Sequence, residues 1–112
     1  MRIPIWSCTL LLYSLLFAGN LLAEEITWID VRTAEEFNQA HLPGAQNIEY
    51  GQIGSDIARL GLEHDAVIYL YCRSGHRAGI AKQTLESLGY TRVENIGGLD
   101  DAVATAKELG KD

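Results

Sequence analysis

Cysteine and histidine are scarce in this sequence, and their scarcity limits the chemistry that it can support. Among 112 residues there are two cysteines, Cys8 and Cys72, and three dispersed histidines, His41, His64 and His76. Structural zinc sites combine four such side chains at short, regular spacings. Because the sequence offers no such cluster, we expect no metal site and no metal cofactor.

Positive charge is scarce as well. The chain has 9 lysines and arginines against 15 aspartates and glutamates, so its formal net charge at pH 7 is −6. Nucleic acids and anionic lipid surfaces attract proteins through clusters of lysine and arginine. An acidic chain gives no support to nucleic-acid binding or to docking on such a membrane. Its length suffices for one domain with a core and is too short for two.

The first 23 residues are almost free of charge. Arg2 is the only charged residue among them, and leucine is concentrated in residues 10–17. This pattern predicts a signal peptide, with cleavage after Ala23 and export to the periplasm. Cleavage after Ala18 is a second option. An uncleaved membrane anchor is the alternative, since the uncharged stretch approaches the roughly 20 residues that span a bilayer.

Removal of residues 1–23 changes the chemistry of the remaining domain, residues 24–112. Its net charge becomes −7 because Arg2 is lost, and Cys8 is lost too, which leaves Cys72 as the only thiol. A single cysteine cannot form an internal disulfide, so Cys72 is a candidate reactive group. A buried structural cysteine is the alternative. We expect this domain to be a monomer without stable membrane insertion.

Strand-like and helix-like patterns alternate along the domain. Short apolar segments predict strands at Trp28–Val31, Ala45–Ile48, Ala66–Tyr71 and Arg92–Ile96. Helices are predicted from the capping box Thr33–Glu36 to about Gln39, from Ser55, from Ala78 with Ala81, Leu85 and Leu88 on its apolar side, and over Leu99–Leu109. Gly89 is placed to cap the third helix, and Gly97–Gly98 is predicted to form a tight turn. This alternation predicts an α/β domain with a parallel sheet in which Ala66–Tyr71 is central.

Cys72 follows the predicted central strand directly and precedes a predicted helix. The helix would aim its unpaired N–H groups at the thiol, which favours thiolate. Arg73, His76 and Arg77 add cationic or proton-carrying side chains within five residues. In parallel sheets the reactive crevice lies at the carboxyl ends of the strands, where Cys72 is placed.

Three chemistries suit a cysteine in such a loop: sulfur transfer through a persulfide, phosphate-ester hydrolysis, and redox exchange. Cysteine phosphatases need five residues between cysteine and arginine to wrap a phosphoryl group, and here Arg77 comes one place too early. Redox exchange normally uses a second cysteine to resolve the first. The loop therefore favours sulfur over phosphorus.

Several motifs together resemble a known family. They are Ile29-Asp30-Val31-Arg32, Glu36-Phe37, His41-Leu42-Pro43-Gly44-Ala45 with Asn47-Ile48, the Cys72 loop, Leu88-Gly89-Tyr90 and Gly97-Gly98-Leu99. In order and spacing they resemble the single-domain rhodaneses, most of all the exported phage-shock-protein-E type. The resemblance implies a five-stranded parallel sheet with helices on both faces. It also implies sulfur transfer from thiosulfate, through a Cys72 persulfide, to cyanide or a thiol, with no cofactor.

The resemblance assigns roles around Cys72, the expected nucleophile. Backbone N–H groups of residues 73–78, which include Ser74 and Gly75, are expected to hold the persulfide. Arg73 and Arg77 are expected to attract the anionic donor, and solvated loop arginines are the alternative. His76 either tunes the thiolate or assists an acceptor thiol, and an exposed loop residue that affects specificity is the alternative.

Other polar and aromatic residues near the site are interpreted as structural. Asp30 and Arg32 end the first predicted strand, and Arg32 is expected to pair with Glu36 across one helical turn. His41 is expected to satisfy backbone groups in its turn. Trp28, Tyr69 and Tyr71 are interpreted as core or strand-face aromatics.

Two rival functions stay open at the level of sequence. One is a persulfide-carrying or sulfur-sensing module that acts with a protein partner and turns over free thiosulfate poorly. The other is a phosphatase or arsenate-handling relative. The physiological donor and acceptor are not specified by these residues.

Overall fold

The computed structural model describes residues 24–110, and the predicted signal peptide lies outside them. Strands and helices alternate in the order β1 (Ile26–Asp30), α2 (Ala34–Gln39), β2 (Gln46–Asn47), α3 (Ile53–Asp56), the 3-10 helix η1 (Ile57–Leu60), β3 (Val67–Cys72), α4 (His76–Ser87), β4 (Arg92–Gly98) and α5 (Leu99–Glu108). The predicted α/β alternation is confirmed.

The strands form one parallel sheet in the order β2-β1-β3-β4. The central position predicted for the third strand is confirmed, since β3 pairs with both β1 and β4. The five strands implied by the family resemblance are not all present, because the sheet has four strands within residues 24–110. The long segment between β2 and β3 folds into α3 and η1, so it supplies no further strand.

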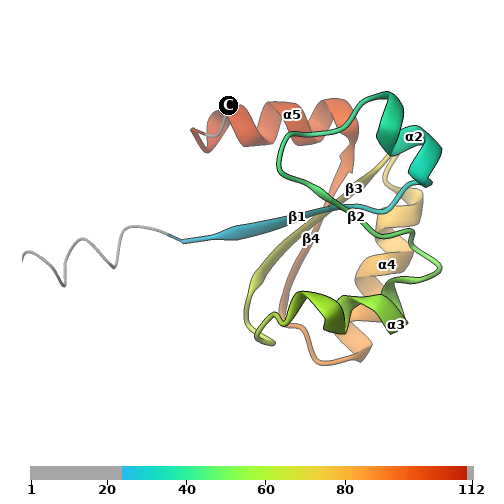
Figure 1. Ribbon diagram of the computed structural model, residues 1–112. Coiled ribbons are helices and arrows are strands. Elements are labelled where there is room, and N and C mark those ends of the chain that lie inside the picture. The colour runs from blue at the N-terminus through green and yellow to red at the C-terminus, as the bar shows by residue number, and fades with distance from the viewer. Residues whose placement is uncertain (1–23, 111–112) are drawn as a thin grey trace, which may run out of the picture.

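Helices cover both faces of the sheet, as expected (Figure 1). Side chains alternate between the faces along each strand. In β3, Ile68, Leu70 and Cys72 pack in the core beneath α3, η1 and α4. Tyr71 faces the other way and packs with Trp28 and the buried alanines of α5. The strand is therefore buried on both sides, which explains its continuous apolar sequence.

Four local predictions need correction. The helix expected from Ser55 begins at Ile53, and the helix expected from Ala78 begins at His76. Leu88 is 44% exposed and contributes nothing to the core. The expected tight turn at Gly97–Gly98 is the end of β4, where a register shift opposite Leu70/Tyr71 lets the strand continue. Gly97 adopts a positive φ of 110°, which explains why its sequence looks like a turn.

The first helix has the capping box that its sequence predicts. The Thr33 hydroxyl accepts from the Glu36 N–H at 3.2 Å, and Oε1 of Glu36 accepts from the Thr33 N–H at 3.0 Å. These bonds satisfy N–H groups at the start of the helix. They also fix the direction of the Glu36 carboxylate, which lies close to the start of α4.

Candidate active site

Cys72 is the last residue of β3 and lies at the carboxyl edge of the sheet. Its Cα pairs in register with Gly98 at the end of β4, and Tyr71 pairs with Gly97. Asp30, at the end of β1, pairs with Tyr71 from the other side. These strand ends share one edge of the sheet, because all the strands run parallel.

The thiol lies inside a tight loop that leads into α4. Gly75 donates its backbone N–H to Cys72 Sγ at 2.9 Å, and Ala78 does the same at 3.4 Å. Gly75 has a φ of 96°, a left-handed conformation that glycine adopts without strain, and it caps α4 without a side chain. The N–H groups that open the helix are therefore available to the sulfur, as the sequence predicts.

Two opposing effects set the acidity of this thiol. Cys72 is 1% exposed, and burial raises the pKa of its thiol. Backbone N–H groups of Ala78, Ser74, Gly75 and Arg77 act against burial and leave the pKa below its ordinary value. The thiolate is thus favoured by backbone dipoles.

The positive charge of Arg77 is balanced, because its guanidinium forms an ion pair with the Glu36 carboxylate. Its two terminal nitrogens donate to the Glu36 carboxylate at 2.8 and 3.1 Å. This bond lowers the pKa of Glu36 to about 2. The prediction of an Arg32–Glu36 ion pair is wrong. The capping box directs the Glu36 carboxylate toward α4, where it binds Arg77. Arg32 pairs with Asp30 instead.

Arg32 pairs with Asp30 at the buried end of β1. Three guanidinium contacts of 2.6 to 3.1 Å reach the Asp30 carboxylate, and Arg32 also donates to the Ala40 carbonyl at 2.7 Å. The Asn47 side-chain amide donates to the carbonyls of Asp30 and Arg32, both at 3.0 Å. This network ties β1 to β2 and to the turn after α2, which agrees with the structural interpretation of Asp30 and Arg32.

The other structural interpretations are confirmed. The His41 ring nitrogen Nδ1 lies 2.8 Å from the Phe37 carbonyl, and the two rings stack. Trp28 and Tyr71 are buried, and Tyr69 packs edge-on against Trp28. The Tyr71 hydroxyl accepts the Leu42 N–H at 3.0 Å, and burial raises the pKa of Tyr71 to about 12.

Arg73, Ser74 and His76 are exposed around the mouth of the loop. Arg73 forms no ion pair with another residue in the described range 24–110. A pocket of about 420 Å³ lies beside it, lined by Arg32, Arg73, Gly98, Leu99, Asp100 and Asp101. Arg73 is therefore the loop cation that is accessible to an anion, whereas the charge of Arg77 is already balanced.

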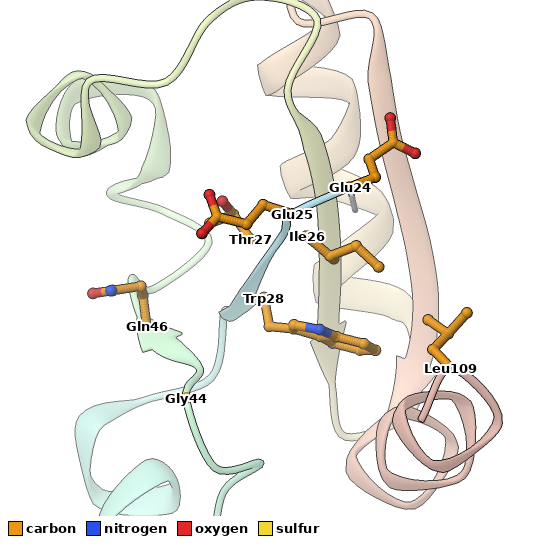
Figure 2. A pocket seen from close by; sticks show the side chains of 8 residues that line it. All are labelled: Glu24, Glu25, Ile26, Thr27, Trp28, Gly44, Gln46 and Leu109. Atoms are coloured by element: carbon orange, nitrogen blue, oxygen red, sulfur yellow. The ribbon is translucent and has the colours of Figure 1, made fainter. Parts of the chain in front are cut away.

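A second pocket, of about 470 Å³, lies at the opposite end of the sheet (Figure 2). Its lining includes Ile26 and Trp28 of β1, together with Leu109 after α5, toward which the Trp28 ring points. Ile26 pairs with Val67 at the start of β3, whereas Cys72 ends that strand. This pocket therefore has no part in the chemistry of Cys72.

The contacts that two residues make with the loop were not predicted from the sequence. Asn95 donates its side-chain amide to the Gly75 carbonyl at 2.9 Å. Gly98 lies so close to the loop that an added Cβ would overlap the Arg73 carbonyl oxygen. A pair of glycines directly before a helix is a signal for close backbone approach, but it does not identify the partner. Asn95 gives no local signal, because its partner is 20 residues away.

Residues 24–110 contain no group of three side chains that could hold a metal ion. Within the same range, no helix is both long and apolar enough to cross a bilayer. The site consists of a cysteine, a ring of backbone N–H groups and the charged side chains around them.

The structure is a parallel α/β domain with a buried, free cysteine at the end of its central strand, and comparison with known proteins identifies its class. Residues 12–104 match the family model of the rhodanese-like domain, and the chain belongs to that family. It is 40% identical over 101 residues to the thiosulfate sulfurtransferase PspE of Escherichia coli (strain K12). That alignment covers 90% of this chain and 95% of its relative.

Two further similarities extend the comparison. A solved structure described as a rhodanese with anions from E. coli superimposes with a TM-score of 0.66 at 40% identity, over 69% of this chain and 91% of that one. The putative sulfur carrier protein YrkF of Bacillus subtilis (strain 168) is 36% identical over 73 residues, which are 65% of this chain and 38% of that protein. The chain thus resembles both a sulfurtransferase and part of a carrier.

Proposed function

We propose that this chain is a thiosulfate sulfurtransferase that moves a sulfane sulfur to cyanide or a thiol through a persulfide on Cys72. The observation that carries the proposal is the pair of hydrogen bonds from Gly75 and Ala78 to Sγ. They favour the thiolate that must attack, and the same N–H groups suit the anionic terminal sulfur of a persulfide. The similarity to PspE supports the same donor.

The reaction has two displacements at sulfur. The Cys72 thiolate attacks the outer sulfur of thiosulfate, the sulfur–sulfur bond breaks, and sulfite leaves with the electron pair. A nucleophilic acceptor then attacks the terminal sulfur of the persulfide, and Cys72 leaves as thiolate. Because Cys72 is 1% exposed, the entering group must be narrow, and the terminal sulfur of thiosulfate carries no substituent that would block it.

Arg73 and Arg77 are proposed to attract the anionic donor, with unequal contributions. Arg73 is exposed beside the loop, where it can contact a small anion directly, although Asp100 and Asp101 line the same pocket and oppose an anion there. Arg77 is held by Glu36, so its contribution is reduced by the carboxylate that it already binds. Ser74 and Gly75 contribute backbone N–H groups, and His76 lies exposed at the mouth of the loop.

Steady-state kinetics of thiocyanate formation from thiosulfate and cyanide test this function. A covalent persulfide predicts ping-pong kinetics, seen as parallel lines in double-reciprocal plots at several cyanide concentrations. Cys72→Ser is expected to lower kcat by at least about three orders of magnitude, because the nucleophile is lost. Intersecting lines, or a folded Cys72→Ser variant that keeps its rate, would contradict the proposal.

A second function is supported by the similarity to the putative sulfur carrier YrkF. As a carrier, the chain would accept one sulfur per Cys72 and pass it to a protein partner, with slow turnover of thiosulfate alone. A stoichiometric persulfide combined with a negligible rate of thiocyanate formation would favour the carrier. Rapid turnover with cyanide and with small thiols would favour the enzyme.

We also propose that residues 1–23 direct export to the periplasm and are removed, and that the remaining domain is a monomer. The uncharged, leucine-rich N-terminal sequence supports export. The start of β1 at Ile26, shortly after the proposed cleavage site at Ala23, supports removal without loss of the fold. A domain of this size is able to fold alone.

A further inference from the structure

Asn95 lies beside the cysteine loop, here defined as residues 73–75, and hydrogen-bonds to its backbone. Its side-chain nitrogen Nδ2 donates to the Gly75 carbonyl at 2.9 Å. Apart from Cys72 itself, no other side chain among residues 24–110 hydrogen-bonds to the backbone of this loop. The side-chain hydrogen bond that ties the loop to β4 is thus the one from the Asn95 amide.

The Asn95 amide is held at both of its ends. Its oxygen Oδ1 accepts the Gly97 N–H at 3.0 Å, at the point where β4 shifts register against β3. This bond orients the side chain so that Nδ2 faces the loop. Because an amide group is planar, fixing the oxygen also fixes the direction of the donor.

Gly75 connects Asn95 to the thiol, because Asn95 binds its carbonyl and its N–H binds the Cys72 sulfur. The carbonyl accepts from Asn95 and from Gly79 N–H, the latter at 2.9 Å. The N–H of the same residue donates to Cys72 Sγ at 2.9 Å. Gly75 has a φ of 96° and no side chain to restrict it, so its orientation depends on such contacts.

Close packing supports the same connection. An added Cβ on Gly75 would lie 3.5 Å from the Cα of Gly97 and 3.7 Å from Asn95 Oδ1. An added Cβ on Gly79 would lie 3.5 Å from Asn95 Nδ2. The amide therefore lies within the width of one methyl group of the glycines of the loop and of the first turn of α4.

We infer that Asn95 is a positioning residue for sulfur transfer: by fixing Gly75, it aims the Gly75 N–H at the Cys72 sulfur. This inference rests on the proposed function and deepens it. Asn95 does not touch the sulfur, so its effect is exerted entirely through the loop. The lowered pKa of the Cys72 thiol, to which the Gly75 N–H contributes, is consistent with this role.

The test is the pH dependence of Cys72 alkylation by iodoacetamide, measured on the full chain by mass spectrometry of the peptide that contains Cys72. In Asn95→Ala the Gly75 carbonyl keeps only the hydrogen bond from the Gly79 N–H, so Gly75 is held less firmly and the pKa of the thiol rises toward the ordinary value of about 8.5. At pH 7 the alkylation rate falls by about threefold to tenfold, and thiocyanate formation falls in parallel. Alkylation needs no sulfur donor, so this readout is independent of the proposed reaction.

Two further variants make the result specific. Glu94→Ala removes an exposed neighbour on the same strand that makes no hydrogen bond to the loop, and its profile is expected to match the wild type. Asn95→Leu keeps a side chain of similar size without a donor and is expected to behave like Asn95→Ala. An alkylation profile of Asn95→Ala that coincides with the wild type would overturn the inference. An alkylation profile of Asn95→Leu that matches the wild type would also overturn the inference, because side-chain packing without a hydrogen bond would then be enough to position Gly75.

Discussion

At the scale of single residues, the sulfur of Cys72 is governed by backbone groups more than by charged side chains. Gly75 and Ala78 contact Sγ directly, whereas Arg77 is bound to Glu36 and Arg73 is exposed beside a pocket. Burial and N–H donors oppose each other, and the donors prevail. The lowered pKa of the thiol therefore depends on the conformation of the loop.

The first prediction concerns the acidity of the thiol. Because its pKa is lowered in the folded protein, alkylation of Cys72 is expected to have its midpoint below about 8.5, the ordinary thiol value. In urea, where the loop is lost, the midpoint should return to that value. The measurement is the alkylation rate against pH in both solvents. Identical midpoints would show that the fold does not activate the thiol.

A second prediction separates the two candidate roles of Arg77. If its guanidinium attracts thiosulfate, Arg77→Ala raises KM for thiosulfate by about threefold to tenfold, while transfer from a preformed persulfide changes little. Glu36→Gln releases Arg77 and should lower the same KM. Steady-state kinetics on both variants measure this. An unchanged KM in both would assign Arg77 a purely structural role.

The ion pair also predicts a dependence of stability on pH. The pKa of Glu36 is about 2 in the folded protein and about 4.3 in an unfolded chain. Its stabilisation is therefore present above pH 4.3 and lost as the pH falls toward 2. Because the pair is partly exposed, we expect Glu36→Gln to cost about 0.2–1 kcal/mol at pH 7. Urea unfolding between pH 7 and 2 should show the difference between variant and wild type vanish at the acid end.

At the scale of elements, the site is built where three parallel strands end and one helix begins. β3 delivers the cysteine, α4 contributes the Ala78 N–H, and β4 supports the loop through Asn95 and Gly98. On the other side, Asp30 and Arg32 hold β1 to β2. Each element therefore fixes a different part of the loop environment.

The close contact between β4 and the loop gives a further prediction. A methyl group at position 98 would overlap the Arg73 carbonyl, so Gly98→Ala must displace the loop. We expect a loss of about 1–3 kcal/mol in the free energy of unfolding and at least a tenfold drop in kcat. Gly51→Ala is the matched control, because nothing lies within 4 Å of an added Cβ there. Urea unfolding measures the free energy and thiocyanate formation measures kcat for the two variants. A fully active Gly98→Ala would contradict the close contact between β4 and the loop.

Sequence reasoning succeeded where the signal is local. The Thr33 capping box, the apolar β3 and the position of Cys72 before a helix all follow from neighbouring residues. It failed for contacts between distant segments: Glu36 binds Arg77, 41 residues away. Asn95 binds Gly75, 20 residues away. Such pairs depend on how the strands align, which no single segment specifies.

At the scale of the whole molecule, the chain combines a domain of the rhodanese-like family with an N-terminal sequence typical of export. Expression of the full chain in a Gram-negative bacterium is expected to yield a periplasmic protein whose N-terminal residue is Glu24, and light scattering should give the mass of a monomer. Cell fractionation measures the periplasmic location, and N-terminal sequencing identifies the first residue. Retention of residues 1–23 in the membrane fraction would instead support an uncleaved anchor.

The central claim is that Cys72 carries the transferred sulfur. Its most direct test is the intact mass of the full chain carrying Cys8→Ser, recorded before and after thiosulfate and again after cyanide. We expect a gain of one sulfur atom that cyanide removes as thiocyanate, and no gain when Cys72→Ser is added. No added sulfur on the variant that keeps Cys72, or an equal gain without Cys72, would contradict it.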